Sequence, residues 1–239
     1  MNVLAGTSGF AFKEWKGVFY PEDMKDAGML AYYASKFPVV EINNTFYQLP
    51  KEKVLRDWAE KVPPTFSFAI KASRRITHFG RLKPESAEIV AYMLKTLEVL
   101  GPRLGPILFQ LPPNMKRDDN RLYGFLDKLP KGKRYAIEFR HESWFDDAVL
   151  MALHQHDVAL VMIEKEDFTA PVYATASWTY ARPHRLDYTS EDFAAWAERL
   201  RYLGREDNYV FFKHDHVPEG GAGPLAVESF VRAFSTPTD

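Results

Sequence analysis

The sequence contains no cysteine among its 239 residues. Disulfides, thiolate nucleophiles, cysteine-ligated zinc and protein-held iron–sulfur clusters are therefore excluded. The sequence also lacks an apolar run approaching the roughly 20 residues that a membrane span needs. Its opening, MNVLAGTSGF, carries neither a basic nor an apolar leader region. We therefore expect a cytoplasmic protein with no membrane partner.

A strong charge of one sign is missing as well. Lys and Arg total 31 against 32 Asp and Glu, which gives a formal net charge of -1. This balance provides no global attraction for nucleic acid or an anionic membrane, although a local basic patch is compatible with it. Hydrophobic residues make up 46% of the chain and aromatic residues 15%, a composition typical of a large packed core rather than of disorder.

Short β-rich segments alternate with segments of helical periodicity along the chain. We predict strands over 3–6, 39–42, 66–71, 106–111, 134–140, 158–164, 178–182 and 209–213. Helices are indicated by stripes such as Val54, Trp58 and Val62, and by a capping box of Thr189 and Asp192. The alternation, the length and the absence of a composition break predict an α/β protein, a TIM-type (β/α)8 barrel in a single domain over residues 1–239. A doubly wound open sheet is the alternative, which is weakened because the first strand runs into GTSGF without a G-x-G-x-x-G fingerprint.

Several predicted strands break their hydrophobic pattern at the carboxyl end. Side chains alternate across a strand, so in VVEIN we expect Val40 and Ile42 to face the helices and Glu41 and Asn43 to face the barrel interior. The carboxyl ends of barrel strands are where such folds build their active sites. A structural ion-pair network is the alternative, although buried charges cost several kcal/mol unless they are paired. The same parity gathers polar side chains from four strands at this end, namely Glu41, Asn43, Lys71, Gln110, Glu138 and Arg140.

The polar cluster suggests acid/base chemistry. We predict Glu41, Glu138 and Lys71 as catalytic residues, with the pKa of one carboxyl group raised by apolar burial and the other carboxylate kept ionised by Lys71 or Arg140. Such a pair supports hydrolysis of, or proton transfer on, a small polar or anionic substrate by a hydrolase or isomerase-type enzyme. A Schiff base at Lys71 is an alternative, although a lysine beside carboxylates usually stays charged.

Further side chains are candidates for substrate binding. Arg140 is suited to a bidentate clamp on a carboxylate or phosphate, and aromatic rings either wall such a pocket or serve as ordinary packing. The segment ASRRITHFGRLK brings basic residues to the same rim with no acid before Glu85, and a basic rim attracts anions. The predicted substrate-binding residues are Asn43, Tyr47, Gln110, Arg140, Trp15, Trp144, Arg182, Arg74 and Arg75.

Two other ligand classes remain open. The segment KHDH supplies His214, Asp215 and His216 near the last strand, and mixed histidine and carboxylate ligands suit zinc or manganese. No strict ligand spacing accompanies them, so we assign no cofactor and keep a divalent metal, or simple loop histidines, as alternatives. The second class is a short nucleic acid, with the basic rim holding phosphates and the aromatic rings stacking on bases.

Five motifs in this order, GTSGF…EWKGVFYP, VEINNTFYQLP, FAIKA…ITH, LGPILFQLPP and YAIEFRHESWF, resemble the domain-of-unknown-function-72 family, also called YecE-like. The likeness covers residues 5 to 164 and continues more weakly over 177–203. It implies a TIM-type barrel and assigns no reaction. The chain departs from the family pattern at Phe10, where the family usually carries Trp, at ARPH, which keeps Arg182 and His184 in an altered frame, and at FKHD, which replaces an Asn-rich ending.

Overall fold

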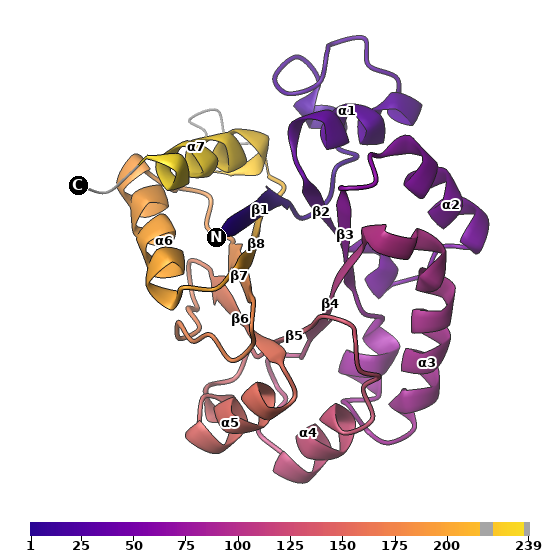
Figure 1. Ribbon diagram of the computed structural model, residues 1–239, viewed down its shortest axis with the longest axis vertical. Helices are drawn as coiled ribbons and strands as arrows, with labels where there is room; N and C mark the ends of the chain where they lie inside the picture. Colours follow the sequence, from indigo (N-terminus) through magenta and orange to yellow (C-terminus); the bar gives the residue numbers. More distant parts are fainter. Residues whose placement is uncertain (216–221, 237–239) are drawn as a thin grey trace.

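The computed structural model describes residues 1–215 and 222–236. One sheet of eight strands, in the order β1-β8-β7-β6-β5-β4-β3-β2, curls into a barrel whose neighbouring strands run parallel (Figure 1). This confirms the predicted TIM-type barrel, and each predicted strand overlaps an observed one. The strands are β1 (Asn2–Thr7), β2 (Val39–Ile42), β3 (Ser67–Lys71), β4 (Leu104–Gln110), β5 (Tyr135–Glu138), β6 (Val158–Glu164), β7 (Thr179–Pro183) and β8 (Asp207–Phe212).

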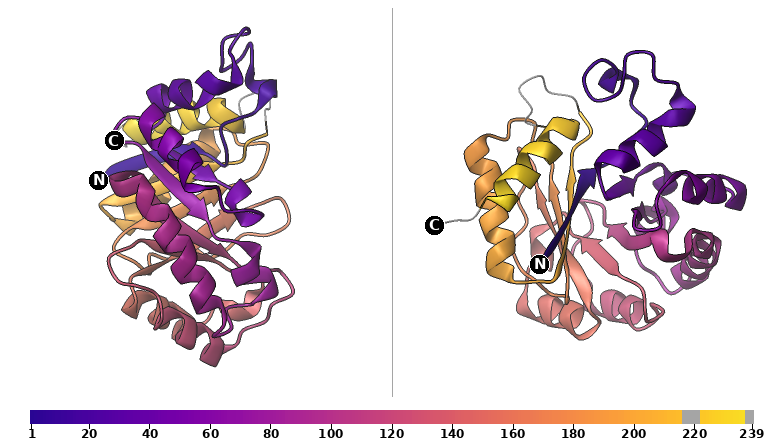
Figure 2. Two further views of the ribbon diagram at one scale, coloured as in Figure 1. Left: turned by 90° about the vertical axis from the view of Figure 1, so that its right-hand side faces the viewer. Right: turned by 45° about the horizontal axis from the view of Figure 1, so that its top comes forward.

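Helices surround the barrel on its outside, as Figures 1 and 2 show. Within the described residues, no helix is both long and apolar enough to cross a membrane. The capping box of Thr189 and Asp192 begins α6 as predicted. Of the stripe predicted on α2, Trp58 packs against the core and Val62 is buried, but Val54 is 39% exposed and Leu55 is buried in its place. The α-helices are α1 (Met29–Lys36), α2 (Glu52–Lys61), α3 (Ser86–Leu97), α4 (Asp119–Leu126), α5 (Asp147–Gln155), α6 (Ser190–Leu203) and α7 (Gly223–Ser235).

The connection between β6 and β7, residues 165–178, contains no helix and so departs from strict alternation. Its sequence includes Pro171, which removes a backbone donor and is disfavoured inside helices. The side chain of Thr175 binds the start of β6 instead: its Oγ1 accepts the N–H of Leu160 at 2.7 Å and donates to the carbonyl of Val158 at 2.8 Å. The loop thereby satisfies backbone groups that a neighbouring strand would otherwise pair.

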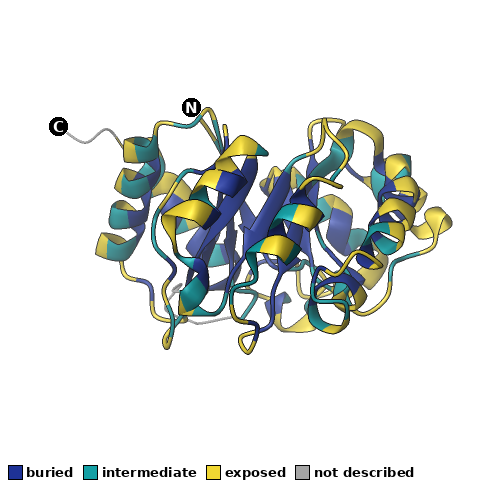
Figure 3. Ribbon diagram, turned by 90° about the horizontal axis from the view of Figure 1, so that it is seen from below, coloured by how far each residue is buried: buried dark blue, intermediate teal, exposed yellow. Residues whose placement is uncertain are grey.

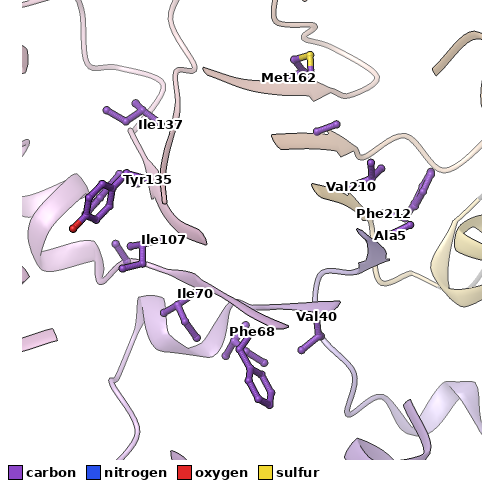
Figure 4. Close-up of a cluster of buried hydrophobic side chains, with 14 of the residues drawn as sticks. Ala5, Val40, Phe68, Ile70, Ile107, Tyr135, Ile137, Met162, Val210 and Phe212 are labelled. Atoms are coloured by element: carbon purple, nitrogen blue, oxygen red, sulfur yellow. The ribbon is translucent and has the colours of Figure 1, made fainter. Parts of the chain in front are cut away.

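Alternation of side chains divides the core into two layers. Figure 4 shows Val40, Ile70 and Ile137 pointing away from the barrel axis toward the helices. Figure 3 shows the strands buried along their length while the helices expose their outer faces. The predicted parity is confirmed. The inward-facing side chains are aliphatic on β3 to β6 and aromatic on and next to β7 and β8. This inner layer includes Ala69, Leu108, Ala136, Ala159, Trp178, Tyr180, Tyr209 and Phe211.

The barrel is closed at a seam between β1 and β2, which are the two ends of the hydrogen-bonded strand order and lie side by side in Figure 1. Tyr33 of α1 bridges this seam, because its hydroxyl accepts the N–H of Thr7 at 2.8 Å and donates to the carbonyl of Val39 at 3.2 Å. A Cβ atom at Gly6 would lie only 2.1 Å from that same carbonyl oxygen. Glycine is therefore required here, since the two backbones approach too closely for a side chain.

Candidate functional site

An arginine joins two carboxylates at the carboxyl end of the barrel. Arg182 of β7 donates from Nη2 to Oε1 of Glu41 at 2.9 Å and from Nη1 to Oε2 of Glu138. These carboxylates come from β2 and β5, and all three side chains are at most 4% exposed. The prediction that separate strands deliver polar side chains to one place is confirmed, with Arg182 at its centre.

Each carboxylate has further donors around it. Glu138 also accepts from Arg140 Nε at 2.7 Å and from Gln110 Nε2 at 2.9 Å. These bonds and the two ion pairs satisfy a buried charge that would otherwise be costly.

The surroundings of Glu41 are equally saturated. It accepts from Ser8 Oγ at 2.8 Å, from Asn43 Nδ2 at 2.9 Å and from the Tyr180 hydroxyl at 2.6 Å. We call the set formed by Arg182, the two carboxylates and these donors the arginine network.

The arginine network keeps both carboxylates ionised. Burial alone would raise the pKa of the Glu138 carboxyl group, but the charges of Arg182 and Arg140 outweigh burial and lower it to about 2. The pKa of Glu41 is lowered for the same reason, by Arg182 and then by the hydrogen bond from Tyr180. The prediction that one of the two carboxyl groups has a raised pKa is therefore wrong, because a single guanidinium lies between both.

Lys71 lies beside the arginine network without an ion pair of its own among the described residues. It ends β3, and its Nζ lies 4.5 Å from the ring centroid of Phe46. Within residues 1–215 and 222–236, no carboxylate oxygen lies within the 4.0 Å ion-pair distance of Nζ. Burial, followed by repulsion from Arg182, lowers the pKa of Lys71 to about 8. The neutral amine of Lys71 is therefore more accessible near neutral pH than that of an ordinary lysine.

His184 lies beside the network just after β7. The hydroxyl of Ser8 donates its proton to Glu41, so at the 3.1 Å contact with His184 the serine oxygen accepts and Nε2 carries the hydrogen. Burial, followed by repulsion from Arg182, lowers the pKa of His184 well below its usual value. The imidazole is therefore neutral, and its Nδ1 keeps a lone pair.

A cavity of about 680 Å³ opens at this end of the barrel. Its size suits a small-molecule ligand. The charged residues among the described part of its lining are all cationic, and the carboxylates of Glu41 and Glu138 are buried away from it. Residues that line the cavity include Asn43, Tyr47, Lys71, Arg182, His184 and Lys213.

Some predicted binding residues lie elsewhere. Trp15 and Trp144 are fully buried and are absent from the cavity lining, so the expectation that they wall the pocket is corrected. Their indole N–H groups donate to the carbonyls of His214 and Met115 instead, at 3.1 and 2.7 Å. Each tryptophan thus packs under a loop that follows a strand, the loop after β8 for Trp15 and the loop after β4 for Trp144. This is a packing role that large aromatic side chains commonly take.

Four other predicted binding residues lie either beside Glu138 or on the exposed rim of the barrel. Gln110 and Arg140 reach Glu138 and do not line the cavity. Arg74 and Arg75 are exposed on the rim. The guanidinium of Arg74 lies 5.3 Å from the ring centroids of both Tyr47 and Phe79, a distance compatible with cation–π contact.

Ser8, Tyr180, His184 and Lys213 are site residues that the sequence-based set of catalytic and substrate-binding residues does not contain. Tyr180 carries a detectable signal, since it shares the inward parity of Arg182 two residues later. Lys213 likewise follows β8 at inward parity with Phe211. Ser8 and His184 lie in loops just beyond their strands, where parity no longer predicts direction.

The metal alternative rests on residues near β8. The ring of His214 stacks on Phe12, with 4.5 Å between centroids, and His216 lies outside the described residues. Over the described ranges, no group of three or more His, Asp or Glu side chains is placed to hold a metal ion.

Comparison with known proteins identifies relatives that share both sequence and fold. The family described as "Protein of unknown function DUF72" matches residues 4–238. The UPF0759 protein YecE of Escherichia coli is 34% identical over 158 residues, which are 64% of this chain and 54% of YecE. The UPF0759 protein YunF of Bacillus subtilis is 29% identical over 133 residues, 53% of this chain and 47% of YunF. The matched stretches thus span about half the length of these curated relatives.

Solved structures agree with the sequence matches. A crystal structure of a DUF72 family protein from Enterococcus faecalis superimposes with a TM-score of 0.80 at 17% identity, covering 100% of this chain and 97% of the other. A DUF72 family protein from Thermotoga maritima gives a TM-score of 0.75 at 26% identity, covering 97% of each chain. Because the family match extends over nearly the whole sequence and the barrel is shared, the chain belongs to the DUF72 family.

Proposed function

We propose that this protein is an enzyme that binds a small anionic substrate in the mouth cavity and catalyses proton transfer on it, as an isomerase or hydrolase does. The observation that carries the proposal is the charge of the cavity. Its described charged lining residues, Lys71, Arg182 and Lys213, are all cationic. The nearby carboxylates are turned into the arginine network and do not line the cavity. Arg182 is paired with those two carboxylates and Lys213 lies 3.5 Å from Asp215, which leaves Lys71 as the lining cation without an ion pair within the described residues. An anion entering the mouth therefore meets a lining whose charged side chains are cationic, with one of them unpaired.

A buried donor supports the same conclusion. Nε of Arg182 is buried and has no hydrogen-bond partner within the described residues, although both Nη atoms are engaged. A buried polar group without a partner is rare and costly in proteins. Nε is closed off from solvent, so a ligand oxygen would satisfy this donor once the Arg182 side chain shifts toward the cavity that it lines.

The roles within the site follow from protonation. Lys71, with a pKa of about 8, is near the value that suits acid/base catalysis at neutral pH. Neutral His184 offers Nδ1 as a second proton acceptor. Glu41 and Glu138 stay ionised and act as positioning residues that fix Arg182, with Gln110 and Asn43 holding the carboxylates in turn.

A ligand panel tests the proposal. Phosphate and glycolate should raise the melting temperature, whereas neutral ethylene glycol at the same ionic strength should not, because only a ligand bound to the folded state stabilises it. Lys213→Gln should weaken the anion effect severalfold. The matched control is Lys83→Gln, which removes an exposed lysine outside the cavity lining and should leave the effect unchanged. Equal responses to glycolate and ethylene glycol, or equal losses in both variants, would refute anion binding in this cavity.

A nucleic-acid role is the second candidate, and one observation favours it. Tyr47 and Phe79 are 68% and 67% exposed, and Arg74 lies against both rings. Exposed rings beside a basic group are a stacking platform for unpaired bases. Filter binding of a short single-stranded oligonucleotide across a salt series tests this role: binding that falls steeply with salt and is lost in Tyr47→Leu supports it, and negligible binding at low salt eliminates it.

A further inference from the structure

Lys71 differs from an ordinary buried lysine in its contacts. Lys71 lines the mouth cavity, and its Nζ lies over the ring of Phe46, 4.5 Å from the centroid. The carboxylates that would normally bind a buried ammonium are both held by Arg182. The amine therefore combines access to the cavity with the lack of a carboxylate partner within the described residues.

We propose that Lys71 is a nucleophile that forms a Schiff base with the carbonyl group of a small substrate. The carboxylate or phosphate group of that substrate binds beside Arg182 and Lys213 of the cavity lining, where it replaces Asp215 as the partner of Lys213. This inference rests on the proposed function and names its substrate class: an aldehyde or ketone that also carries an anionic group. In this inference Lys71 forms a covalent bond with the substrate rather than acting as an acid or base, and His184 transfers the protons.

The charges that face Lys71 favour its neutral, nucleophilic form. Arg182 of β7 and Arg140 after β5 oppose its protonation, while Glu41 of β2 and Glu138 of β5 support it. The positive side prevails because burial adds to it, and the pKa falls to about 8. A lysine that is desolvated and adjacent to another cation is one of the known ways of activating an amine for Schiff-base chemistry.

His78, in the π-helical turn of residues 75–79, also faces the lysine. Its ring lies edge-on to Phe46 with 4.8 Å between centroids. Burial and then the charge of Lys71 lower the pKa of His78, so this imidazole adds no positive charge at neutral pH.

The covalent step balances without an added reagent. The lone pair of neutral Nζ attacks the carbonyl carbon and a C–N bond forms. Nζ then releases one proton and the former carbonyl oxygen takes one from solvent, which gives a carbinolamine. Loss of the hydroxyl group as water, with one proton supplied, breaks the C–O bond and leaves the iminium. No atom is oxidised or reduced. His184 lines the same cavity, so its Nδ1 accepts the proton released by Nζ and returns it to the departing hydroxyl. The iminium then withdraws electrons from the adjacent carbon, whose proton becomes easier to remove.

Borohydride trapping tests the Schiff base directly, because reduction converts an iminium into a stable secondary amine. The protein is incubated with glyoxylate or with glycolaldehyde phosphate, reduced, digested and mapped by mass spectrometry. The two probes carry an aldehyde beside a carboxylate or a phosphate, so the stronger label identifies the preferred anion. At neutral pH a pKa of about 8 leaves on the order of a hundred times more neutral amine than an ordinary lysine has, so labelling of Lys71 should exceed the mean of the other lysines by at least about tenfold.

Matched anions without a carbonyl serve as controls. Glycolate and ethyl phosphate occupy the anion site but form no imine, so each should protect Lys71 from its matching aldehyde. In Lys71→Arg the site keeps its charge, and the enriched label should disappear while glycolate still raises the melting temperature. Because the wild-type label is itself mapped to a residue, the result stands even if Lys71→Arg folds poorly.

Two outcomes would overturn the inference, and they are distinguishable. Labels spread over exposed lysines without enrichment at Lys71, while glycolate or ethyl phosphate still raises the melting temperature, would refute the Schiff base and leave the proposed anion-binding enzyme intact. Failure of every anion to stabilise the protein, together with no label at Lys71, would refute both.

Discussion

At the scale of single residues, the charge of Lys71 lowers the stability of the folded protein, whereas the charge of Glu138 raises it. Lys71 is a half-buried cation that the fold penalises, since desolvation and Arg182 lower its pKa. Glu138 is a buried anion that the fold stabilises, since Arg182 and Arg140 overcome its burial. A site built for binding commonly contains residues of the first kind, because function and stability make different demands on the same position.

Lys71→Met should stabilise the protein at pH 7. The pKa falls from 10.5 in the unfolded chain to about 8 in the folded one, so below pH 8 the full penalty for burying the charge is present, roughly 3 kcal/mol by linkage. Between pH 8 and about 10.5 the unfolded state binds more protons, so wild-type stability rises with pH and the advantage of methionine shrinks. Urea unfolding at pH 7 and pH 10 measures this, with the exposed Lys83→Met as control. A destabilised Lys71→Met at pH 7 would contradict the assignment.

Glu138→Gln should destabilise the protein strongly. Removal of one carboxylate leaves the charges of Arg182 and Arg140 under-compensated, a change that typically costs about 3–5 kcal/mol for a buried pair. The control is Glu142→Gln at a neighbouring exposed site, which should have almost no effect on the free energy of unfolding.

The pH dependence of the Glu138 variant has a definite sign. Because the folded-state pKa is depressed from 4.5 to about 2, the stabilisation is fully present above pH 4.5 and is lost as pH falls toward 2. Acid unfolding of Glu138→Gln should therefore be flatter than that of the wild type across this window, by roughly 3 kcal/mol. Parallel acid titrations of the two proteins would contradict the ion pairing.

Residue-level prediction from the sequence succeeded where strand parity applies. Parity correctly gathered Glu41, Lys71 and Glu138, because alternation fixes which face each side chain occupies. It could not show that Arg182 lies between two carboxylates, since this depends on distances across the barrel. The predicted protonation failed for the same reason.

At the scale of elements, the seam between β1 and β2 depends on a few atoms. One hydroxyl, from Tyr33, satisfies both the N–H of Thr7 and the carbonyl of Val39. Tyr33→Phe should therefore lower the free energy of unfolding by about 1–3 kcal/mol, because it leaves buried backbone groups without their partner. Gly6→Ala should cost at least as much, since its Cβ would lie 2.1 Å from a carbonyl oxygen.

Urea unfolding measures both seam variants. The matched control is Tyr32→Phe on the same helix, a tyrosine that is only partly buried and should lose little. Tyr33→Phe with wild-type stability would show that the seam closes without the hydroxyl.

The sequence predicted elements well where a periodic signal was strong. All eight strands were found because each is a short β-rich run, and the capping box located the start of α6. One member of the stripe on α2 was misplaced, because Val54 and Leu55 are both apolar and spacing alone could not choose the buried one. The helix-free link of residues 165–178 was missed because alternation was assumed to continue.

At the scale of the whole molecule, a net charge of -1 conceals an uneven distribution. Cations gather at the mouth, where Lys71, Arg182 and Lys213 line the cavity. Salt should therefore weaken the binding of phosphate, because screening acts over about 8 Å at physiological ionic strength. Because of this screening, we expect the affinity for phosphate to fall severalfold when the salt concentration rises from about 0.02 to about 0.2 M. Calorimetric titration at the two salt concentrations measures it, and a salt-independent affinity would argue against the cationic cavity.

The strand order also bears on how the barrel is completed during synthesis. β1 leaves the ribosome before every other strand of the sheet, yet its hydrogen-bonded neighbour is β8, with Asn2 opposite Asp207 and Thr7 opposite Phe212. The earliest strand must therefore wait for about two hundred further residues before its edge is paired, and contacts so distant in sequence slow folding. Until then the nascent chain exposes an unpaired edge, which is a template for aggregation. This barrel should accordingly depend on chaperones in the interval between the translation of its first and last strands.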